Sequence, residues 1–298
     1  MKIRIGFGLG ARTGVDDQDR YRLLVDELER LRFDSLWVSE RIGAPGPDPT
    51  VAMAMAAART ERLKVGMSVM VLPGRNPVVL AKELASLDVL AGGRLLPAFG
   101  LGVANAAEHQ AFGVRREDRA AMFNEALTLM RRLWTSDDVT HDGRFFTVES
   151  VTVRPRPMQD PLEVWMGGVA PSELKRVGRM SDGWLPSFVT PAMVAAGRAE
   201  IERVAAEHGR HIDDEHYGVL IPYATAPIDD RVMAFVAQRN PDVDPTDIIA
   251  ADPEALTAMI ERFVAVGASK FVAVPFAPLD DVTAELERLA AAVRPLET

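Results

Sequence analysis

The pattern of hydrophobic and polar residues is clearest over residues 60–99, where it predicts one complete β–α–β unit. Residues 64–72 are an almost unbroken apolar run, which is typical of a strand buried on both faces. Asn76 followed by Pro77 predicts the N-cap and first position of a helix, and apolar residues recur after it at helical spacing. A Gly-Gly pair then predicts the helix end, and residues 94–99 begin the next buried strand.

The same alternation of strand and helix patterns continues along the chain and predicts eight strands. Their ranges are 3–9, 35–38, 64–72, 94–99, 163–166, 183–185, 217–223 and 270–275. Strands that alternate with helices predict a parallel sheet covered by helices. Eight such units favour a closed (β/α)8 TIM barrel over a doubly wound sheet, and the length of 298 residues fits one barrel with insertion segments. We therefore expect a single domain over residues 1–298.

Other segments add detail to this barrel. Long amphipathic helices are predicted at residues 19–31, 48–59, 117–134, 191–206 and 282–292. Asp142-Gly143, within the alternating residues 140–148, predicts a β-hairpin turn. Residues 225–251 are rich in turn-forming residues, and we expect them to form an insertion or a lid.

Composition and charge exclude several classes of protein. The net charge of -9 argues against a nucleic-acid partner, because an acidic surface repels phosphates. The absence of cysteine excludes disulfides and thiolate chemistry, and no apolar run is long enough to span a membrane. The chain also begins directly with a strand pattern rather than a signal peptide. We expect a cytoplasmic protein without a membrane partner.

Two loops that follow predicted strands contain paired glycines. Gly100 and Gly102 follow the fourth strand, at the end of a parallel strand where α/β enzymes bind ligands. Gly167 and Gly168 follow the fifth strand and precede a helix that starts near Ser172. The second loop is either a phosphate cradle at a helix N-terminus or an ordinary glycine turn.

Charged residues near strand ends are candidates for acid–base chemistry. Glu40 and Arg41 follow the second strand, where they are either catalytic groups or a solvent-exposed ion pair. Glu108 and His109 follow the fourth strand, and residue type alone favours the start of a surface helix there. The remaining histidines show no metal-ligand spacing, so no metal site is predicted.

Glycines also lie within the first strand. No Gly-x-Gly-x-x-Gly pattern opens a helix after this strand, so a dinucleotide site is not indicated. The missing side chain at Gly8 either leaves room for a flat ring against the backbone or only lets a barrel strand bend.

Taken in order, these motifs resemble the bacterial luciferase-like family of flavin and deazaflavin oxidoreductases. The resemblance extends from about residue 3 to residue 184 and more loosely to residue 275. The matching segments are residues 60–72, 76–94 and 125–134, Phe145-Phe146, residues 154–157, Trp165-Met166-Gly167-Gly168 and Asp182-Gly183-Trp184.

The resemblance implies a barrel that binds FMN or coenzyme F420, an 8-hydroxy-5-deazaflavin, at the carboxyl ends of its strands. It implies that Ser68-Val69 is a non-prolyl cis peptide that supports the ring system. It also implies that the loop from Gly167 through Val169 to Ser172 holds the cofactor phosphate. A small-molecule substrate and a homodimer are expected on the same ground.

The chain departs from the family at one position. Many relatives have a histidine-bearing pair after the second strand, where this chain has Glu40 and Arg41. Glu108 matches a glutamate of the relatives, and His109 stands where an aromatic residue is usual. If the missing histidine is the proton donor in relatives, this protein uses another group or carries out a different reaction, and these four residues are the candidates.

Three hypotheses follow. The first is an F420-dependent oxidoreductase that transfers a hydride between the deazaflavin and a small organic substrate. The second is an FMNH2-dependent luciferase-like monooxygenase that activates O2. The third is a flavin- or deazaflavin-binding protein without turnover, which the missing histidine motivates.

Overall fold

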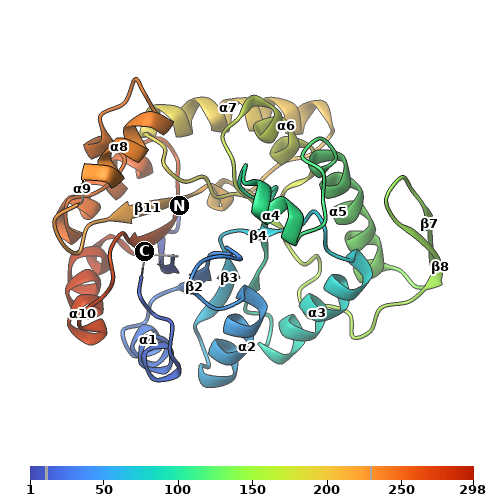
Figure 1. Cartoon of the computed structure of the whole chain (residues 1–298), viewed down its shortest axis with the longest axis horizontal. Helices are drawn as coiled ribbons and strands as arrows, with labels where there is room; N and C mark the ends of the chain where they lie inside the picture. The colour runs from blue at the N-terminus through green and yellow to red at the C-terminus, as the bar shows by residue number, and fades with distance from the viewer. Residues whose placement is uncertain (11–12, 229) are drawn as a thin grey trace.

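Eight parallel strands surround the centre of the molecule, and helices cover them on the outside (Figure 1). The computed structural model describes residues 1–10, 13–228 and 230–298. In that part of the chain the barrel strands are β1 (Arg4–Leu9), β2 (Ser35–Val38), β3 (Lys64–Met67) with β4 (Met70–Val71), β5 (Leu95–Leu96) with β6 (Ala98–Gly100), β9 (Trp165–Met166), β10 (Gly183–Trp184), β11 (Gly218–Tyr223) and β12 (Lys270–Pro275).

Two hydrogen-bonded sheets share these strands. One has the order β11-β12-β1-β2-β3-β5 and the other the order β10-β9-β6-β4. The sheets are continuous with each other because β3 runs on into β4 and β5 into β6. The predicted strands at residues 64–72 and 94–99 are each interrupted, the first at the Ser68-Val69 peptide, which is cis, and the second at Pro97, which has no N–H to donate.

Parallel bridges close the ring on its other side. Trp184 pairs with Tyr217, and Ser187 pairs with Leu220, which joins β10 to β11. Because β11 already pairs with β12 and β12 with β1, the strands form a complete circuit. The predicted (β/α)8 barrel is therefore confirmed.

The helices begin where the sequence predicts them. The main helices are α1 (Gln18–Arg30), α2 (Pro49–Arg59), α3 (Pro77–Leu90), α5 (Arg119–Thr135), α6 (Pro171–Met180), α7 (Pro191–Glu207), α9 (Pro253–Val264) and α10 (Val282–Val293). Asn76 caps α3 by accepting the backbone N–H groups of Val78 and Val79, and Asp252 accepts the N–H of Ala255 at the start of α9. Among the described residues, no helix is long and apolar enough to cross a membrane.

Three smaller segments lie outside the regular units. The predicted hairpin is present as β7 (Val139–Asp142) and β8 (Thr147–Val151), which extend away from the barrel beside α5 (Figure 1). A short helix, α4 (Ala106–Ala111), follows β6. Within residues 225–251, the predicted insertion, α8 (Asp230–Arg239) and the 3-10 turn Pro245–Asp247 lie between β11 and α9.

A buried ion cluster joins the amino ends of three strands. Asp34, before β2, lies 2.9 Å from Lys270 Nζ of β12 and 3.2 Å from Lys64 Nζ of β3. The Asp34 side chain is only 8% exposed. Burial acts to raise the pKa of the Asp34 carboxyl, but the two lysines outweigh it and lower this pKa to about 2. The cluster stabilises the end of the barrel opposite the cavity described below.

The cluster predicts a defined loss of stability in acid. As the pH falls, the Asp34 carboxyl is protonated at a higher pH in the unfolded chain than in the folded chain. The contribution of this carboxylate to the free energy of unfolding is therefore complete above about pH 4 and disappears toward pH 2. We expect Asp34→Asn to lower the free energy of unfolding by about 2 kcal/mol or more at neutral pH and to lose this deficit near pH 2. Urea unfolding from pH 2 to 7 measures both.

The control for this experiment is Asp26→Asn, which breaks the exposed ion pair between Asp26 and Arg59. An exposed pair of this kind contributes at most about 1 kcal/mol, so the variant should stay close to the wild type at every pH. A pH-independent effect of Asp34→Asn would contradict the prediction.

Candidate active site

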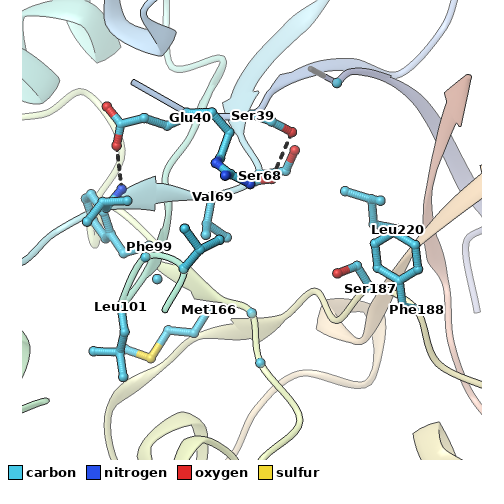
Figure 2. Close-up of a pocket in the computed structure, with 18 of the residues that line it drawn as sticks. Ser39, Glu40, Ser68, Val69, Phe99, Leu101, Met166, Ser187, Phe188 and Leu220 are labelled. Carbon is cyan, nitrogen blue, oxygen red and sulfur yellow. Dashed lines mark hydrogen bonds between the residues drawn. The ribbon is translucent and has the colours of Figure 1, made fainter. Parts of the chain in front are cut away.

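A cavity of about 480 Å3 opens at the carboxyl ends of the barrel strands. Its lining comes from residues that end or follow several strands, among them Ser39, Gly100, Met166, Pro222 and Pro275. Figure 2 shows the two walls of this cavity, with Val69, Phe99, Leu101 and Met166 on one side and Ser187, Phe188 and Leu220 on the other. TIM barrels form their active sites at this end.

The first wall is built around the cis peptide between Ser68 and Val69. Ser39 Oγ donates a hydrogen bond of 3.2 Å to the Ser68 carbonyl oxygen (Figure 2). The Ser68 Oγ atom is buried and has no hydrogen-bond partner among the described residues. Because a buried hydroxyl group normally has a partner, this atom suits a ligand that offers a polar group.

Glycines of neighbouring strands give Val69 its room. A Cβ atom at Gly100 would lie 2.5 Å from Val69 Cγ2, and one at Gly167 would lie 3.5 Å from Val69 Cγ1. The packing of Val69 therefore requires a glycine at position 100, whereas a Cβ atom at position 167 would make only an ordinary contact.

The second wall is mainly apolar. Phe188 and Phe276 pack edge to face with their ring centroids 6.0 Å apart, and Leu220 and Val274 lie in the same wall. The Ser187 hydroxyl group is the polar exception, and it points toward the cavity (Figure 2). Phe188 and Phe276 also contact the small apolar cluster of the insertion, whose buried members are Val236, Ile248 and Ile249.

Glu40 lines the cavity, but its carboxylate already has partners. One oxygen accepts the Val71 N–H at 2.6 Å, and the other is paired with Arg75. Burial raises the pKa of the Glu40 carboxyl, and these partners offset that effect only in part. The arrangement joins the end of β2 to the turn after β4.

Arg41 and Glu108 both line the cavity and form an ion pair with each other. Arg41 Nε lies 2.7 Å from Glu108 Oε1, and the two side chains are 43% and 10% exposed. Two candidates that are far apart in the sequence are thus brought into contact, with a carboxylate oxygen and a guanidinium group beside one space. His109 is not part of the cavity lining, and its Nε2 lies 3.1 Å from the Val103 carbonyl oxygen.

The loop before α6 is closed by a side chain of the helix itself. Glu173 Oε2 accepts the backbone N–H groups of Val169 and Ala170, both at 3.0 Å. Gly168 has φ +94°, and a Cβ atom there would lie 2.6 Å from the Glu173 carboxyl carbon. The N–H groups that the sequence suggested for a phosphate therefore bind an internal carboxylate.

Arg176 is a site residue that the sequence did not reveal. Its side chain is buried and lines the cavity. Nε donates a hydrogen bond of 3.0 Å to Asn124 Oδ1, and the guanidinium carbon lies 5.5 Å from the centre of the Phe123 ring. Burial lowers the pKa of Arg176. No carboxylate pairs with it in the part of the chain that the structure describes.

Four of the predicted site residues lie outside the cavity lining. His109 and Val169 have the contacts described above, and Ser172 is exposed on the first turn of α6. The space expected beside Gly8 is filled by a side chain, because a Cβ atom there would lie 2.5 Å from Val274 Cγ2. Close packing of the first strand against β12 therefore explains this glycine, and the space beside it is taken by Val274.

Comparison with known families decides the relationship. The sequence profile of the luciferase-like monooxygenase family matches residues 3–240. The chain belongs to this family. A luciferase-like relative, the F420-dependent glucose-6-phosphate dehydrogenase of Kineococcus radiotolerans, is 28% identical over 309 residues, which cover 91% of this chain and 90% of that enzyme.

Other luciferase-like proteins are similar over different lengths. The limonene 1,2-monooxygenase of Rhodococcus erythropolis is 30% identical over 198 residues, which cover 64% of this chain and 51% of that enzyme. An F420-dependent secondary alcohol dehydrogenase, solved with an F420–acetone adduct, superposes with a TM-score of 0.81 over 99% of this chain and 100% of its own, at 22% identity. This superposition supports the fold.

The cavity fits a flavin or deazaflavin in two respects. The Val69 wall is apolar and has an unpartnered buried hydroxyl group at Ser68, which suits the face and edge of a flat ring with polar atoms. Arg176 offers a buried positive charge for the acidic tail of either cofactor. The N–H groups before α6 fit less well, because Glu173 already holds them.

The close packing of Val69 predicts the effect of a methyl group. We expect Gly100→Ala to push Val69 toward the cavity and to lower the free energy of unfolding by about 1–3 kcal/mol. Urea unfolding measures the stability, and Gly43→Ala is the control because no atom lies within 4 Å of a Cβ there. Equal stability of the two variants would show that Val69 moves freely.

Proposed function

We propose that this protein is an F420-dependent oxidoreductase that transfers a hydride between the deazaflavin and a small organic substrate. The observation that supports this most is the cavity itself, where the Ser68-Val69 wall, Arg176 and the Arg41–Glu108 pair face one space at the carboxyl ends of the strands. The F420-dependent relative that matches nine tenths of the chain supports the choice of cofactor.

The bound deazaflavin would supply the carbon that accepts or gives the hydride. In our proposal, Val69 supports the ring and Ser68 gives it a polar contact. Glu108 takes or returns the proton of the substrate oxygen at its carboxylate, and Arg41 holds that carboxylate in place through their 2.7 Å contact. Glu40, whose oxygens are held by Val71 and Arg75, positions the wall and does not transfer a proton.

The apolar second wall indicates the kind of substrate. Phe188, Phe276 and Leu220 exclude water and offer no charge, and Ser187 provides one hydroxyl contact. This wall favours an uncharged organic molecule with a single polar group, such as an alcohol or a ketone.

The alternative function is an FMNH2-dependent monooxygenase. Two similarities support it. One relative is a limonene 1,2-monooxygenase, and the family to which the chain belongs is named for luciferase-like monooxygenases. The apolar second wall is compatible with an apolar substrate of this reaction as well. The two functions differ in the cofactor, so cofactor binding separates them.

The first experiment is a fluorescence titration of the purified protein with F420 and, separately, with FMN. We expect F420 to bind at micromolar concentration or below and FMN at least about tenfold more weakly, a difference of about 1.4 kcal/mol. The opposite preference, together with oxygen consumption in the presence of reduced FMN, would favour the monooxygenase. If F420 binds tightly but no alcohol of a test panel reduces it, a protein without turnover would be favoured.

The proposed proton transfer predicts the behaviour of Glu108→Gln. We expect the hydride-transfer rate to fall by about 100-fold or more while F420 affinity changes less than threefold, because the amide cannot accept the proton. Stopped-flow fluorescence of F420 with a reactive alcohol measures the rate. Glu40→Gln is the comparison, and a larger rate loss there than at Glu108 would reverse the two roles.

We also propose a cytoplasmic homodimer. Exposed apolar side chains on the adjacent helices α2 and α3, namely Val51, Val79 and Leu90, support self-association. Light scattering of the purified protein tests the oligomeric state, and a monomeric mass at micromolar concentration would exclude the dimer.

A further inference from the structure

Arg176 is a buried charge that forms no salt bridge with the described residues. It is 6% exposed, its direct contacts among these residues are the neutral side chains of Asn124 and Phe123, and the charge of Glu173 offsets only part of the effect by which burial lowers its pKa. Removing a guanidinium group from water is strongly unfavourable unless an opposite charge compensates. An apolar residue of similar length would fill this place in α6 without that cost, so packing alone does not explain an arginine here.

The position of Arg176 within the cavity limits what compensates its charge. It lies on α6, which follows β9, and β9 pairs with β6 in the wall that contains Val69. The apolar wall of Phe188 and Leu220 comes from the opposite side of the cavity (Figure 2). An anionic group next to Arg176 therefore belongs to a molecule bound along the Val69 wall.

The usual anion site at a helix N-terminus is not free in this chain. The N–H groups of Val169 and Ala170 both bind Glu173 Oε2, so a phosphate has to displace this carboxylate or bind elsewhere. Glu173 also brings a negative charge to the same part of the cavity. A phosphate at this end of the cavity needs a cation, and Arg176 is the buried one.

We propose that Arg176 binds the phosphate group of the bound cofactor through its free guanidinium N–H groups and that Glu173 opposes this binding. The inference rests on the proposed function. Guanidinium groups suit phosphate because two N–H groups can bind two oxygens at once. A phosphorylated substrate offers the same chemistry, and the experiment separates the two sources.

The test compares F420 with 8-hydroxy-5-deazaflavin that has only its ribityl chain and no phosphate. We expect Arg176→Met to weaken F420 binding by about 10- to 100-fold and to leave the affinity for the phosphate-free compound unchanged. Fluorescence titration measures both affinities. The matched control is Arg179→Met, which removes the same charge from an exposed position on the same helix and should change F420 affinity less than threefold.

Glu173→Gln tests the opposing charge. Its amide oxygen still accepts the N–H groups before α6, while the negative charge is lost. We expect F420 to bind about 3- to 10-fold more tightly to this variant, with no change for the phosphate-free compound. Weaker F420 binding would show that Glu173 contributes to the phosphate site.

Stability provides a second measurement. Because Arg176→Met removes a buried charge that has no salt bridge among the described residues, its melting temperature without ligand should equal or exceed that of the wild type. A variant that binds F420 weakly because it is misfolded would instead melt lower and would also lose the phosphate-free compound.

The outcomes separate this inference from the proposed function. If the wild type binds neither deazaflavin, the proposed function fails. If it binds both and Arg176→Met changes neither affinity, the function stands and the inference is wrong. If Arg176→Met changes only the binding of glucose 6-phosphate to the F420-loaded protein, Arg176 serves a substrate phosphate and the cofactor assignment is overturned.

Discussion

The site depends on the close approach of three strands around one valine. Val69 lies in the interrupted strand between β3 and β4, and its two methyl groups face Gly100 and Gly167 at the ends of neighbouring strands. A side chain at Gly100 would take the space of one of these methyl groups. The wall of the cavity is therefore fixed by the absence of a side chain at Gly100 as much as by the residues that line it.

Most of the fold could be predicted because its signals are local. Asn76-Pro77 gives a helix start through one cap and one fixed dihedral angle. Asp142-Gly143 marked the place of the hairpin, although its loop is formed by residues 143–146 and Asp142 still pairs with Thr147 in the ladder. Buried apolar runs mark barrel strands because both faces of such strands are covered. The break between β5 and β6 at Pro97 is harder to predict, because the apolar pattern of the strand continues on both sides of it.

The site was predictable only in part, because contacts between distant residues decide it. Nothing near Arg41 in the sequence indicates that Glu108 will pair with it, and nothing near Glu40 indicates Arg75. Arg176 has the appearance of a surface residue in an amphipathic helix, and only burial and the lack of a carboxylate distinguish it. Helical spacing predicts on which face of a helix a residue lies, but not the charge of the groups that surround it in the folded protein.

The insertion between β11 and α9 has a small apolar core of its own, and that core shares Phe188 and Phe276 with the second wall of the cavity. The wall around Val69 contains no residue of this cluster, whereas the opposite wall combines Leu220 and Val274 of the barrel strands with two aromatic rings that rest on the insertion. Substrate preference can in this way diverge between descendants of one barrel while the redox chemistry is inherited unchanged.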